Sequence, residues 1–495
     1  MAEYNAPGVY LESVNSTSRS VQGRATDVFG FVGVTPRGTT EPTLVTSWNN
    51  FIEEFAGGLA SPFLADFDLS YAVYGFFQNG GTRAVIARVT TSETKTAATP
   101  AENATFKMSA KDGGAWGNNL KVSIKKNAIN EDTFDVIVKL GTTIVESFAN
   151  VTNNKDDYLY VFDVINAQSN YITLTDETAC TLAVTETDFT FEGGADGLLN
   201  PETNATIVKD NDYCNAIDRM GEVDDISFLS VPGVSTDAVI QKLKDFVDGT
   251  YRFTVGIIDV PKGCNTKTMA LDFRKKIQSD SLCVVEPWGY VTDPLSPSGR
   301  LRLVPPSGHW CGYEAENIHT NGIQKAPAGT EATITGFVSL EKNYTAEDLE
   351  MINPAGIITL INKKNYGIVI WGCRSCSSDP NYRYITDKIV DNYIDGSIYA
   401  GTQWAVFEDN DPDLWDDLTT SVTEFLENCR TSGIIKGTTP QTSYYVNCNE
   451  DINTDAVQKS GKVICEYGFA KKKPAEFVIH RVNHNMATAN TAEEA

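Results

Sequence analysis

The histidines of this chain are the residues that would have to activate a catalytic serine, and there are four, His309, His319, His480 and His484. A serine hydrolase places a histidine within hydrogen-bond reach of its nucleophile, often on a Gly-x-Ser-x-Gly turn. The sequence contains no such turn. His309 stands in PPSGHW, which predicts a turn, where a structural or solvated histidine is more common than a catalytic one. The histidines therefore indicate no catalytic residues.

Two cysteines, Cys373 and Cys376, form the stretch CRSC, whose spacing suits a zinc ligand pair or a redox pair. A zinc site needs four ligands, and no second Cys-x-x-Cys or nearby His-x-x-x-His completes this one. The ten cysteines are otherwise widely spaced, and the N-terminus resembles no secretory signal. We therefore expect reduced cysteines, mostly buried, in a protein made and assembled in the cytoplasm.

Alternating carboxylates at Asp409, Asp411 and Asp413 resemble the start of a calcium loop. Such a loop needs Gly at its sixth position and Glu at its twelfth, where this chain has Leu414 and Thr420. Helix capping explains the cluster better. The glycine-rich stretch GGADG lacks the Lys and Ser/Thr of a phosphate loop and favours a hinge. The sequence predicts no metal site and no cofactor.

The composition is that of a large, acidic globular chain. It has 495 residues, 41% hydrophobic residues and a net charge of -25. Nucleic-acid binding needs a positive surface, so we expect no nucleic-acid partner. No apolar run approaches the roughly 20 residues of a membrane helix, so we expect no direct membrane insertion.

The N-terminal part alternates strand and helix patterns. The stretch VFGFVGVT (28–35) predicts a buried strand, 68–81 predicts a helix that stops at two glycines, and TRAVIARVT (82–90) predicts a second strand. This order is typical of a βαβ unit. From 92 to 192 the pattern changes to Thr- and Val-rich strands separated by turns, which predicts an inserted all-β domain that closes on FEGGADG.

Strand and helix patterns alternate again after this hinge. Strands are predicted at ISFLSVPG, RFTVGIIDVP and LCVVEPWGYV, with a helix over 235–249 that Ser235 could cap. The alternation favours a parallel sheet covered by helices.

The last third predicts a compact α+β unit. A helix is expected near Ile385–Ile394, and a longer one begins with Asp411 as N-cap and Pro412 in the first turn. Its apolar stripe is Leu414, Leu418, Val422, Phe425 and Leu426. Strands TSYYVNC, GKVICEYGFA and PAEFVIHRV finish the pattern.

Both chain ends carry apolar material that a terminus does not usually expose. The first twenty-five residues predict an extended arm, and PAEFVIHRV, read as a strand, is largely apolar on both faces. We expect both ends to pair with neighbouring chains by strand addition. The apolar residues concerned are a short cluster near the start, Val9, Tyr10 and Leu11, and the middle of the last predicted strand, Phe477, Val478 and Ile479.

Several stretches, taken together and in order, resemble the contractile tail sheath proteins of bacteriophages and of phage-tail-like bacteriocin particles. The stretches are APGVYLESV with DVFGFVGVT, GGAWGNNLKVSI, FEGGADG, GIQKAPAG, VIWGCRS with NYRYIT, QWAVFEDNDPDLW and PAEFVIH. They span nearly the whole chain. The sequence departs from the usual pattern at CRSC, where Ala-Arg-Thr is commoner.

The resemblance implies an α/β and α+β multidomain fold, in which a subtilisin-like α/β part serves as a scaffold without enzyme activity. It also implies an inserted domain that faces outward and terminal arms that complete a sheet shared between neighbours. Carried over to this chain, the resemblance implies pairing through Val9, Tyr10 and Leu11 in one arm and through Phe477, Val478 and Ile479 in the other. The division expected is an N-terminal arm (1–25), the start of the α/β core (26–91), the β-rich insert (92–192), the α/β domain (193–345), the C-terminal α+β domain (346–473) and a C-terminal strand arm (474–495).

The function implied is that of a sheath subunit, which polymerises around a tail tube and contracts from a metastable extended state to drive the tube through a cell envelope. Its partners would be further copies in stacked hexameric rings, the tail tube protein, and baseplate and tail terminator proteins. Its place would be the tail of a virion or of a phage-tail-like particle, after assembly in the cytoplasm of a bacterial host. Contraction would need no nucleotide.

The basic run Lys471, Lys472 and Lys473 stands out in an acidic chain. We hypothesise a weak, releasable contact with the tube or a neighbour, and a solvated loop is the alternative. For the whole chain, the alternative to a sheath is an α/β hydrolytic enzyme with a degenerate or unrecognised active site. A fibrous tail component would show internal repeats, which the sequence lacks.

Overall fold

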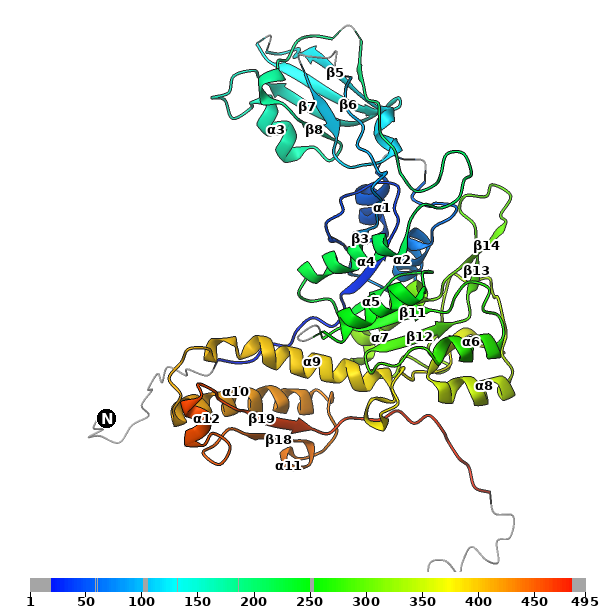
Figure 1. The fold of residues 1–495 in the computed structure, drawn as a ribbon, viewed down its shortest axis with the longest axis vertical. Helices are drawn as coiled ribbons and strands as arrows, with labels where there is room; N and C mark the ends of the chain where they lie inside the picture. The colour runs from blue at the N-terminus through cyan, green and yellow to red at the C-terminus, as the bar shows by residue number, and fades with distance from the viewer. Residues whose placement is uncertain are drawn as a thin grey trace, which may run out of the picture.

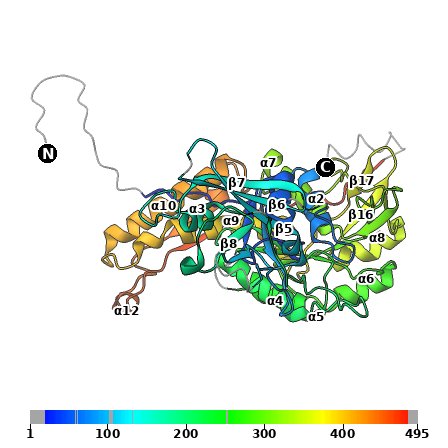
Figure 2. The same ribbon diagram turned by 90° about the horizontal axis from the view of Figure 1, so that it is seen from above.

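The computed structural model describes residues 19–57, 59, 61–100, 106–130, 132–185, 187–249 and 253–482. Figure 1 shows three bodies: a β-rich unit at the top, an α/β body in the middle and a helical lobe at the bottom. Figure 2 shows that, seen from above, the lobe projects to one side of the α/β body. Within the described chain, no helix is long and apolar enough to cross a membrane.

The α/β body is built on an eight-stranded sheet in the order β17-β16-β12-β11-β10-β1-β3-β2. The six central strands run parallel, while the edge strands β2 and β17 run antiparallel to their neighbours. The strands are β1 (Phe29–Gly33), β2 (Thr43–Val45), β3 (Ala84–Arg88), β10 (Phe228–Ser230), β11 (Val255–Asp259), β12 (Leu282–Glu286), β16 (Ile357–Lys363) and β17 (Gly367–Ile370).

The predicted βαβ unit is confirmed. Strand β1 is buried over its whole length and pairs in parallel with β3, with α2 (Leu69–Gln78) between them in the chain. Phe29 and Phe31 belong to one apolar cluster and Val32 to another, because successive side chains point to opposite faces. Both faces of the sheet are therefore covered.

Helices α2 and α7 (Ser307–Asn321) pack together on one face of the sheet. The other apolar cluster includes side chains from α4 (Asp210–Arg219), α5 (Asp237–Val247) and α6 (Lys267–Arg274). The remaining helices of the body are α1 (Trp48–Ala56) and α8 (Ala346–Ile352).

Three local predictions were wrong. The stretch LCVVEPWGYV divides at Pro287, which lacks an N–H for a sheet, into β12 and β13 (Gly289–Thr292). Strand β13 joins a separate sheet with β14 (Leu301–Val304) and β15 (Ser339–Leu340). Helix α5 is capped by Thr236 and not Ser235, since the Thr236 side chain accepts from the Val239 N–H. His309 lies in α7 and not in a turn, because a proline is tolerated where a helix begins.

The β-rich unit has its own core. It contains a four-stranded sheet in the order β7-β6-β5-β9 and a two-stranded sheet β4-β8. These are β4 (Met108–Ala110), β5 (Leu120–Lys126), β6 (Phe134–Leu140), β7 (Thr143–Val151), β8 (Ile172–Leu174) and β9 (Phe189–Thr190). The all-β prediction missed α3 (Val161–Gln168), whose Val161 and Ile165 are buried four residues apart, the spacing of one helix face.

The C-terminal lobe packs α9 (Ile385–Gly401) and α10 (Pro412–Thr431) against a two-stranded sheet of β18 (Tyr444–Asn447) and β19 (Glu466–Phe469). The short helices α11 (Pro440–Ser443) and α12 (Asp455–Lys459) complete it. The predicted cap is confirmed, since Asp411 accepts from the Leu414 N–H, and the predicted apolar stripe of α10 is buried. PAEFVIHRV, predicted as a strand, forms no strand within this chain.

Candidate assembly site

Helix α9 holds the described parts of both chain ends. The N-terminal segment 19–27 runs along one side of it, where the Arg24 N–H donates to Ser397 Oγ at 3.0 Å. Val21 is buried against Gly401, one turn further on. Arg19 lies over the ring of Trp404, just beyond the end of the helix. The N-terminal segment therefore leaves the body at the C-terminal end of α9 (Figure 1).

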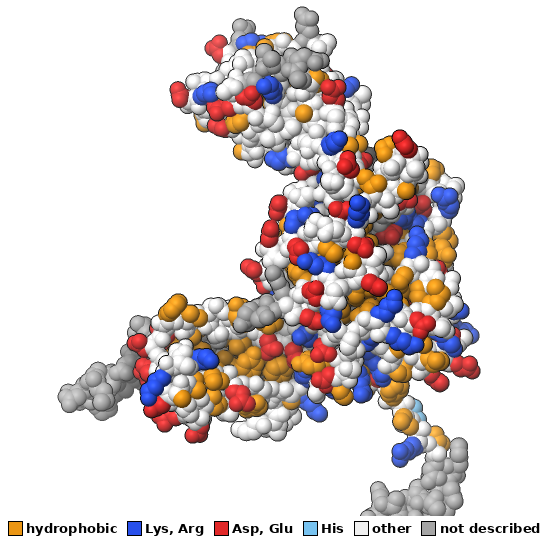
Figure 3. Space-filling view, viewed as in Figure 1, with side chains coloured by type: hydrophobic (Ala, Val, Ile, Leu, Met, Phe, Trp, Pro, Cys, Tyr) orange, Lys and Arg blue, Asp and Glu red, His pale blue; other side chains and the backbone are white. Residues whose placement is uncertain are grey.

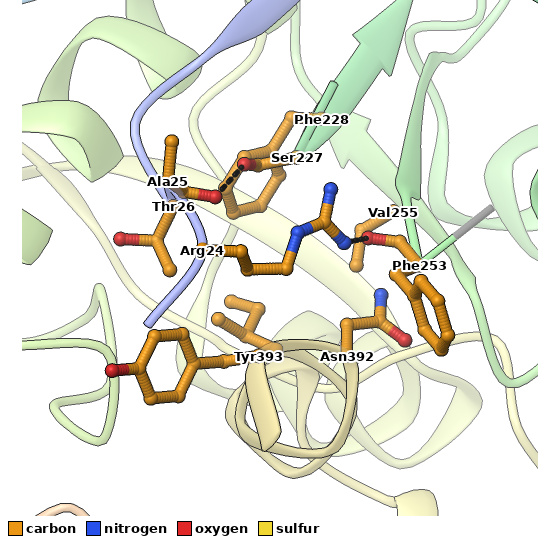
Figure 4. A pocket seen from close by; sticks show the side chains of 10 residues that line it. Arg24, Ala25, Thr26, Ser227, Phe228, Phe253, Val255, Asn392 and Tyr393 are labelled. Carbon is orange, nitrogen blue, oxygen red and sulfur yellow. Dashed lines mark hydrogen bonds between the residues drawn. The ribbon is translucent and has the colours of Figure 1, made fainter. Parts of the chain in front are cut away.

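Arg24 fixes this segment to the α/β body as well as to the helix. Its Nη1 donates to the Phe253 carbonyl at 3.1 Å, and Ser227 Oγ donates to the Ala25 carbonyl at 3.1 Å (Figure 4). Burial lowers the pKa of Arg24, and the nearby Asp225 opposes that shift. The space that remains around these side chains is about 10 Å³, the size of one water. This is a packing junction and not a ligand site.

The opposite side of α9 carries three carboxylates, Asp387, Asp391 and Asp395, spaced four residues apart. Each receives a group from the C-terminal segment. Lys473 Nζ lies 2.8 Å from Asp387 Oδ1, and Lys471 Nζ lies 2.8 Å from Asp391 Oδ2. The Tyr467 hydroxyl donates to Asp395 Oδ1 at 2.8 Å.

For Asp391 and Asp395, burial and these contacts act on the pKa in opposite directions. Burial raises the pKa of Asp391 and the pKa of Asp395. Hydrogen bonds from Lys471 and Tyr467, respectively, oppose these shifts.

The C-terminal segment runs antiparallel to α9. Tyr467 contacts Asp395, near the C-terminal end of the helix, and Lys473 contacts Asp387, near its N-terminal end. The contact between Lys471 and Asp391 lies between these two.

The three lysines predicted to contact a tube or neighbour make contacts within this chain. Lys471 and Lys473 form the ion pairs described above, and Lys472 Nζ donates to the Gly433 carbonyl. Lys471 also lies over the ring of Tyr382, 4.4 Å from its centroid. The predicted outside contact stays a prediction, and the ion pairs give two of these lysines partners without it.

Glu476 fixes the point where the C-terminal segment leaves the body. Its carboxylate accepts from Arg374 Nε at 2.9 Å and Arg374 Nη2 at 2.7 Å, a two-pronged pair. It also accepts from Asn353 Nδ2 and from the Tyr384 hydroxyl. Burial acts to raise the pKa of Glu476, but hydrogen bonds from Arg374, Asn353 and Tyr384 outweigh it and hold the pKa below its usual value.

Beyond Glu476 the described chain is extended and apolar, and it stands clear of the body (Figure 3). Phe477 is 70% exposed, Val478 73% and Ile479 81%. The other predicted pairing residues, Val9, Tyr10 and Leu11, lie outside the described residues. Glu476 is held near Tyr384, at the N-terminal end of α9, so the two chain ends leave at opposite ends of a helix about 25 Å long.

The sheet β18-β19 has an open edge on each side. It has two strands in the described chain, paired from Tyr444 with Phe469 to Asn447 with Glu466. Each strand therefore presents an outer row of backbone groups without a third strand to pair with. An isolated hairpin is marginal in water, and here packing on α10 supports it.

The described histidines form no catalytic set, and His484 lies outside the described residues. His309 is buried, stacks on Phe337 with 4.0 Å between ring centroids, and has its pKa lowered to about 3 by burial. Ser307 Oγ instead donates to Asp259 Oδ2 at 2.7 Å, and the Ser307 N–H donates to Asp259 Oδ1. The Gly233 N–H also donates to this carboxylate. Asp259 therefore ties β11 to the start of α7 as a structural contact.

The other candidates also have structural roles. Cys373 and Cys376 are free and buried, and burial raises the pKa of Cys373 to about 12 and that of Cys376 to about 11. Asp411 caps α10, as described above. Among the residues that the structure describes, no group of three or more His, Cys, Asp or Glu side chains could hold a metal ion.

Family models match most of the chain in consecutive order. The phage tail sheath protein beta-sandwich domain matches residues 86–196, the central domain matches 207–376 and the C-terminal domain matches 377–485. The chain belongs to the phage tail sheath proteins. The resemblance read from the sequence is thereby confirmed.

A curated relative and solved structures agree with this assignment. A prophage major tail sheath protein of Pseudomonas aeruginosa is 26% identical over 255 residues, which cover 50% of this chain. The match spans 62% of that relative's length. A sheath tail protein from Listeria innocua has a TM-score of 0.64 at 13% identity, covering 92% of this sheath protein and 96% of the other chain.

Two contracted assemblies contain chains of similar fold. The helical sheath of the anti-feeding prophage has a TM-score of 0.61 at 19% identity. The match covers 97% of this chain and 100% of the other chain. The PVC sheath complex of an extracellular contractile injection system has a TM-score of 0.61 at 18% identity. The match covers 99% of this chain and 100% of the other chain. At these identities the likeness establishes a mixed α/β multidomain sheath fold.

Sequence reasoning missed the residues that hold the ends of this sheath protein in place. The spacing of four residues places Asp387, Asp391 and Asp395 on one helix face, which the sequence shows. The sequence does not indicate which residues contact them. Glu476 and Arg374 are 102 residues apart, and no local pattern links them.

Proposed function

We propose that this protein is the subunit of a contractile tail sheath. Copies polymerise around a tail tube and later contract, which drives the tube through the target cell envelope. The observation that carries the proposal is the match of consecutive sheath family models over residues 86–485, with only 197–206 between them. A hydrolytic function gains no support, because the buried His309 stacks on Phe337 and Ser307 donates to Asp259.

The open sheet of the C-terminal lobe supplies a route for polymerisation. We infer that the segment from Phe477 onward adds as a strand to the β18-β19 edge of a neighbouring copy, and that the N-terminal arm pairs there too. Strand addition gives partners to edge N–H and C=O groups, and it also covers the apolar side chains of Phe477, Val478 and Ile479. Each copy would then be tethered to neighbours through both ends.

The anchors on α9 allow the tethers to work as hinges. Arg19 and Val21 make the outermost described contacts of the N-terminal end, and Glu476 holds the C-terminal end. The described backbone beyond Glu476, residues 477–482, carries no regular structure that would resist reorientation. Bodies could then slide and rotate while the strand pairs stay intact. The driving force would be a difference in free energy between two packings of the same subunits, fixed at assembly, with no nucleotide consumed.

The wider setting follows the same proposal. The copies would stack as hexameric rings, and contact the tail tube, baseplate and tail terminator proteins, in the tail of a virion or a phage-tail-like particle, after assembly in the host cytoplasm. The α/β body would serve as a scaffold of subtilisin-like fold, and the unit near residues 92–192 would face outward. Lys471 to Lys473 would help a releasable contact only if their internal ion pairs open.

Assembly of the purified protein tests the proposal. We would compare the full chain with a chain that ends after Glu476, which keeps the Arg374 contact, and with a control that ends after Val482. Negative-stain electron microscopy and sedimentation should show tubes or rings from the full chain and the control, and monomers from the chain that ends after Glu476.

Tubes from the chain that ends after Glu476 would contradict assembly through the C-terminal arm. Monodisperse particles from all three chains would contradict self-polymerisation altogether. Circular dichroism of each chain checks that the body is folded, so that a loss of tubes reports on the arm.

A further inference from the structure

Two cysteines face each other at the inner end of the β18-β19 hairpin, in a region where the sequence offered no motif. Asn447 pairs with Glu466 as the last pair of the antiparallel register. Cys448 follows the first of these and Cys465 precedes the second, so continuing the register by one residue places the cysteines opposite each other. Opposed residues of an antiparallel pair have Cα atoms about 4.5 to 5.5 Å apart, within the range that a disulfide spans.

The two thiols are in contact, and their pKa values shift in opposite directions: the pKa of Cys448 is lowered and that of Cys465 is raised. Both are free, and Cys448 is buried in an apolar cluster with Leu414 and Trp415 against which Cys465 packs. The Cys465 thiol donates a hydrogen bond to Cys448, which lowers the pKa of Cys448 although burial acts to raise it. Asn453 Nδ2 also donates to Cys448 Sγ at 3.5 Å. Both donors stabilise a thiolate at Cys448.

The surrounding loop holds this arrangement. Asn453 is fully buried, and its side chain donates to the Ile464 carbonyl at 3.0 Å and accepts from the Ile464 N–H at 2.7 Å. Asn453 thus connects the segment after β18 to the residue just before Cys465. The hydrogen bonds of the buried Asn453 side chain therefore help to keep the two cysteines aligned.

We propose that Cys448 and Cys465 form a redox-active pair that a low-molecular-weight disulfide converts to a cross-strand disulfide. A thiolate of the pair attacks one sulfur of the external disulfide, breaks its S–S bond and releases one thiolate. The second protein thiol loses its proton and attacks the protein-bound sulfur, releasing the other thiolate. One S–S bond is exchanged for another, and the two protons end on the two released thiols.

The disulfide would close the loop 449–464, including α12, at the base of the hairpin. Cross-linking restricts the unfolded loop more than the folded one, so the hairpin would open less readily. The inference does not rest on sheath assembly, because exchange takes place within one chain.

The test incubates the full chain with oxidised glutathione and maps disulfides by peptide mass spectrometry without reduction. We expect one major product that links the peptides of Cys448 and Cys465, loses two free thiols and reverts with dithiothreitol. Cys448→Ala and Cys465→Ala should each abolish it, while Cys373→Ala should leave it unchanged.

A second readout separates the pair from a folding defect. Hydrogen exchange of residues 444–447 should slow in the oxidised protein and return to its starting rate after reduction. The inference is overturned if the folded chain keeps both thiols under conditions that link a control dithiol peptide, or if Cys373 and Cys376 form the link instead.

Discussion

The β-rich insert and the C-terminal lobe differ in how many strands pair in their sheets and in how well their apolar side chains are buried. The insert pairs four strands in one sheet and encloses a core of its own, with Val136, Val138 and Ile165 fully buried. The lobe has two strands in the described chain, and the apolar segment that follows them is mostly exposed. The described insert therefore encloses its core within one chain, whereas the lobe leaves sheet edges and apolar side chains exposed.

This difference predicts which substitutions should affect assembly and which should affect stability. The insert joins the body through paired backbone at Lys95 and Ala195 and through Arg37, which lies between the rings of Trp116 and Tyr171. Changes inside the insert should alter stability and spare assembly. Changes in the exposed arm should spare stability and alter assembly.

The largest effect is expected from the arm. Replacing Phe477, Val478 and Ile479 together by serine should abolish tube formation, because the apolar face that a neighbour would cover is lost. The midpoint of thermal unfolding of the monomer should stay the same, because these side chains are exposed. Electron microscopy and calorimetry measure the two effects. A lowered midpoint, or tubes at wild-type yield, would show that the arm is not an unpartnered strand.

The insert should give the opposite result. Ile165→Ala should lower the free energy of unfolding by about 2 to 5 kcal/mol, because it leaves a cavity in a closed core. Ile144→Ala, at a 60% exposed position in the same insert, should change it by less than about 0.5 kcal/mol. Urea unfolding measures both, and both variants should still form tubes. Loss of tubes from a folded Ile165→Ala protein would contradict the independence of the insert.

Glu476→Gln should loosen the base of the arm. Loss of charge-assisted hydrogen bonds is worth about 1.5 to 3 kcal/mol, so trypsin cleavage after Lys472 should accelerate about tenfold to a hundredfold, while Pro474 blocks cleavage after Lys473. Glu347→Gln, at an exposed position of α8 that does not line the cavity beside Glu476, is the matched control. An unchanged cleavage rate would mean that Glu476 does not hold the arm.

Lowering the pH should weaken the contact between Glu476 and Arg374 in the wild-type protein as well. The pKa of Glu476 is lowered in the folded chain, so its stabilisation is present above the usual pKa and is lost as the pH falls through the lowered pKa. Hydrogen exchange of residues 470–476, corrected for intrinsic rates, should rise over that interval. A rise centred at neutral pH would assign the release to another group.

The smallest effects should come from the lysine run. Lys472→Ala should change the free energy of unfolding by less than about 0.5 kcal/mol, since its contact is exposed. Lys471→Ala should cost about 1 to 3 kcal/mol, because it leaves the largely buried Asp391 without its cation. Urea unfolding of the two variants makes the comparison. Equal effects would contradict the docking of this run on α9.

Local patterns predicted much of the fold. The apolar run at 28–35 and the helix pattern before TRAVIARVT gave the βαβ unit, and Asp411 with Pro412 marked the start of α10, because each depends on nearby residues. Relations between distant segments could not be predicted. Alternation in PAEFVIHRV shows that a strand is possible, but it does not say which chain supplies the partner.

The same limit applies to the candidate site. Glu476 meets Arg374, and Cys448 meets Cys465, only because of tertiary pairing and strand register. The two cysteines of the conspicuous CRSC motif, by contrast, are buried in the core. Spacing along the sequence was therefore a poor guide to which side chains interact.

Cross-linking between copies tests the central claim most directly. One chain carries Ile479→Cys and another carries Tyr445→Cys, which is half exposed on β18, so neither chain can link the two positions by itself. The chains are mixed, assembled and treated with a short bismaleimide, with the unsubstituted chain as background. The account predicts heterodimers that link positions 479 and 445 in the assembled fraction and are absent from the monomer fraction. Tubes without this link, at linker lengths that reach across one strand spacing, would contradict strand addition at the β18 edge.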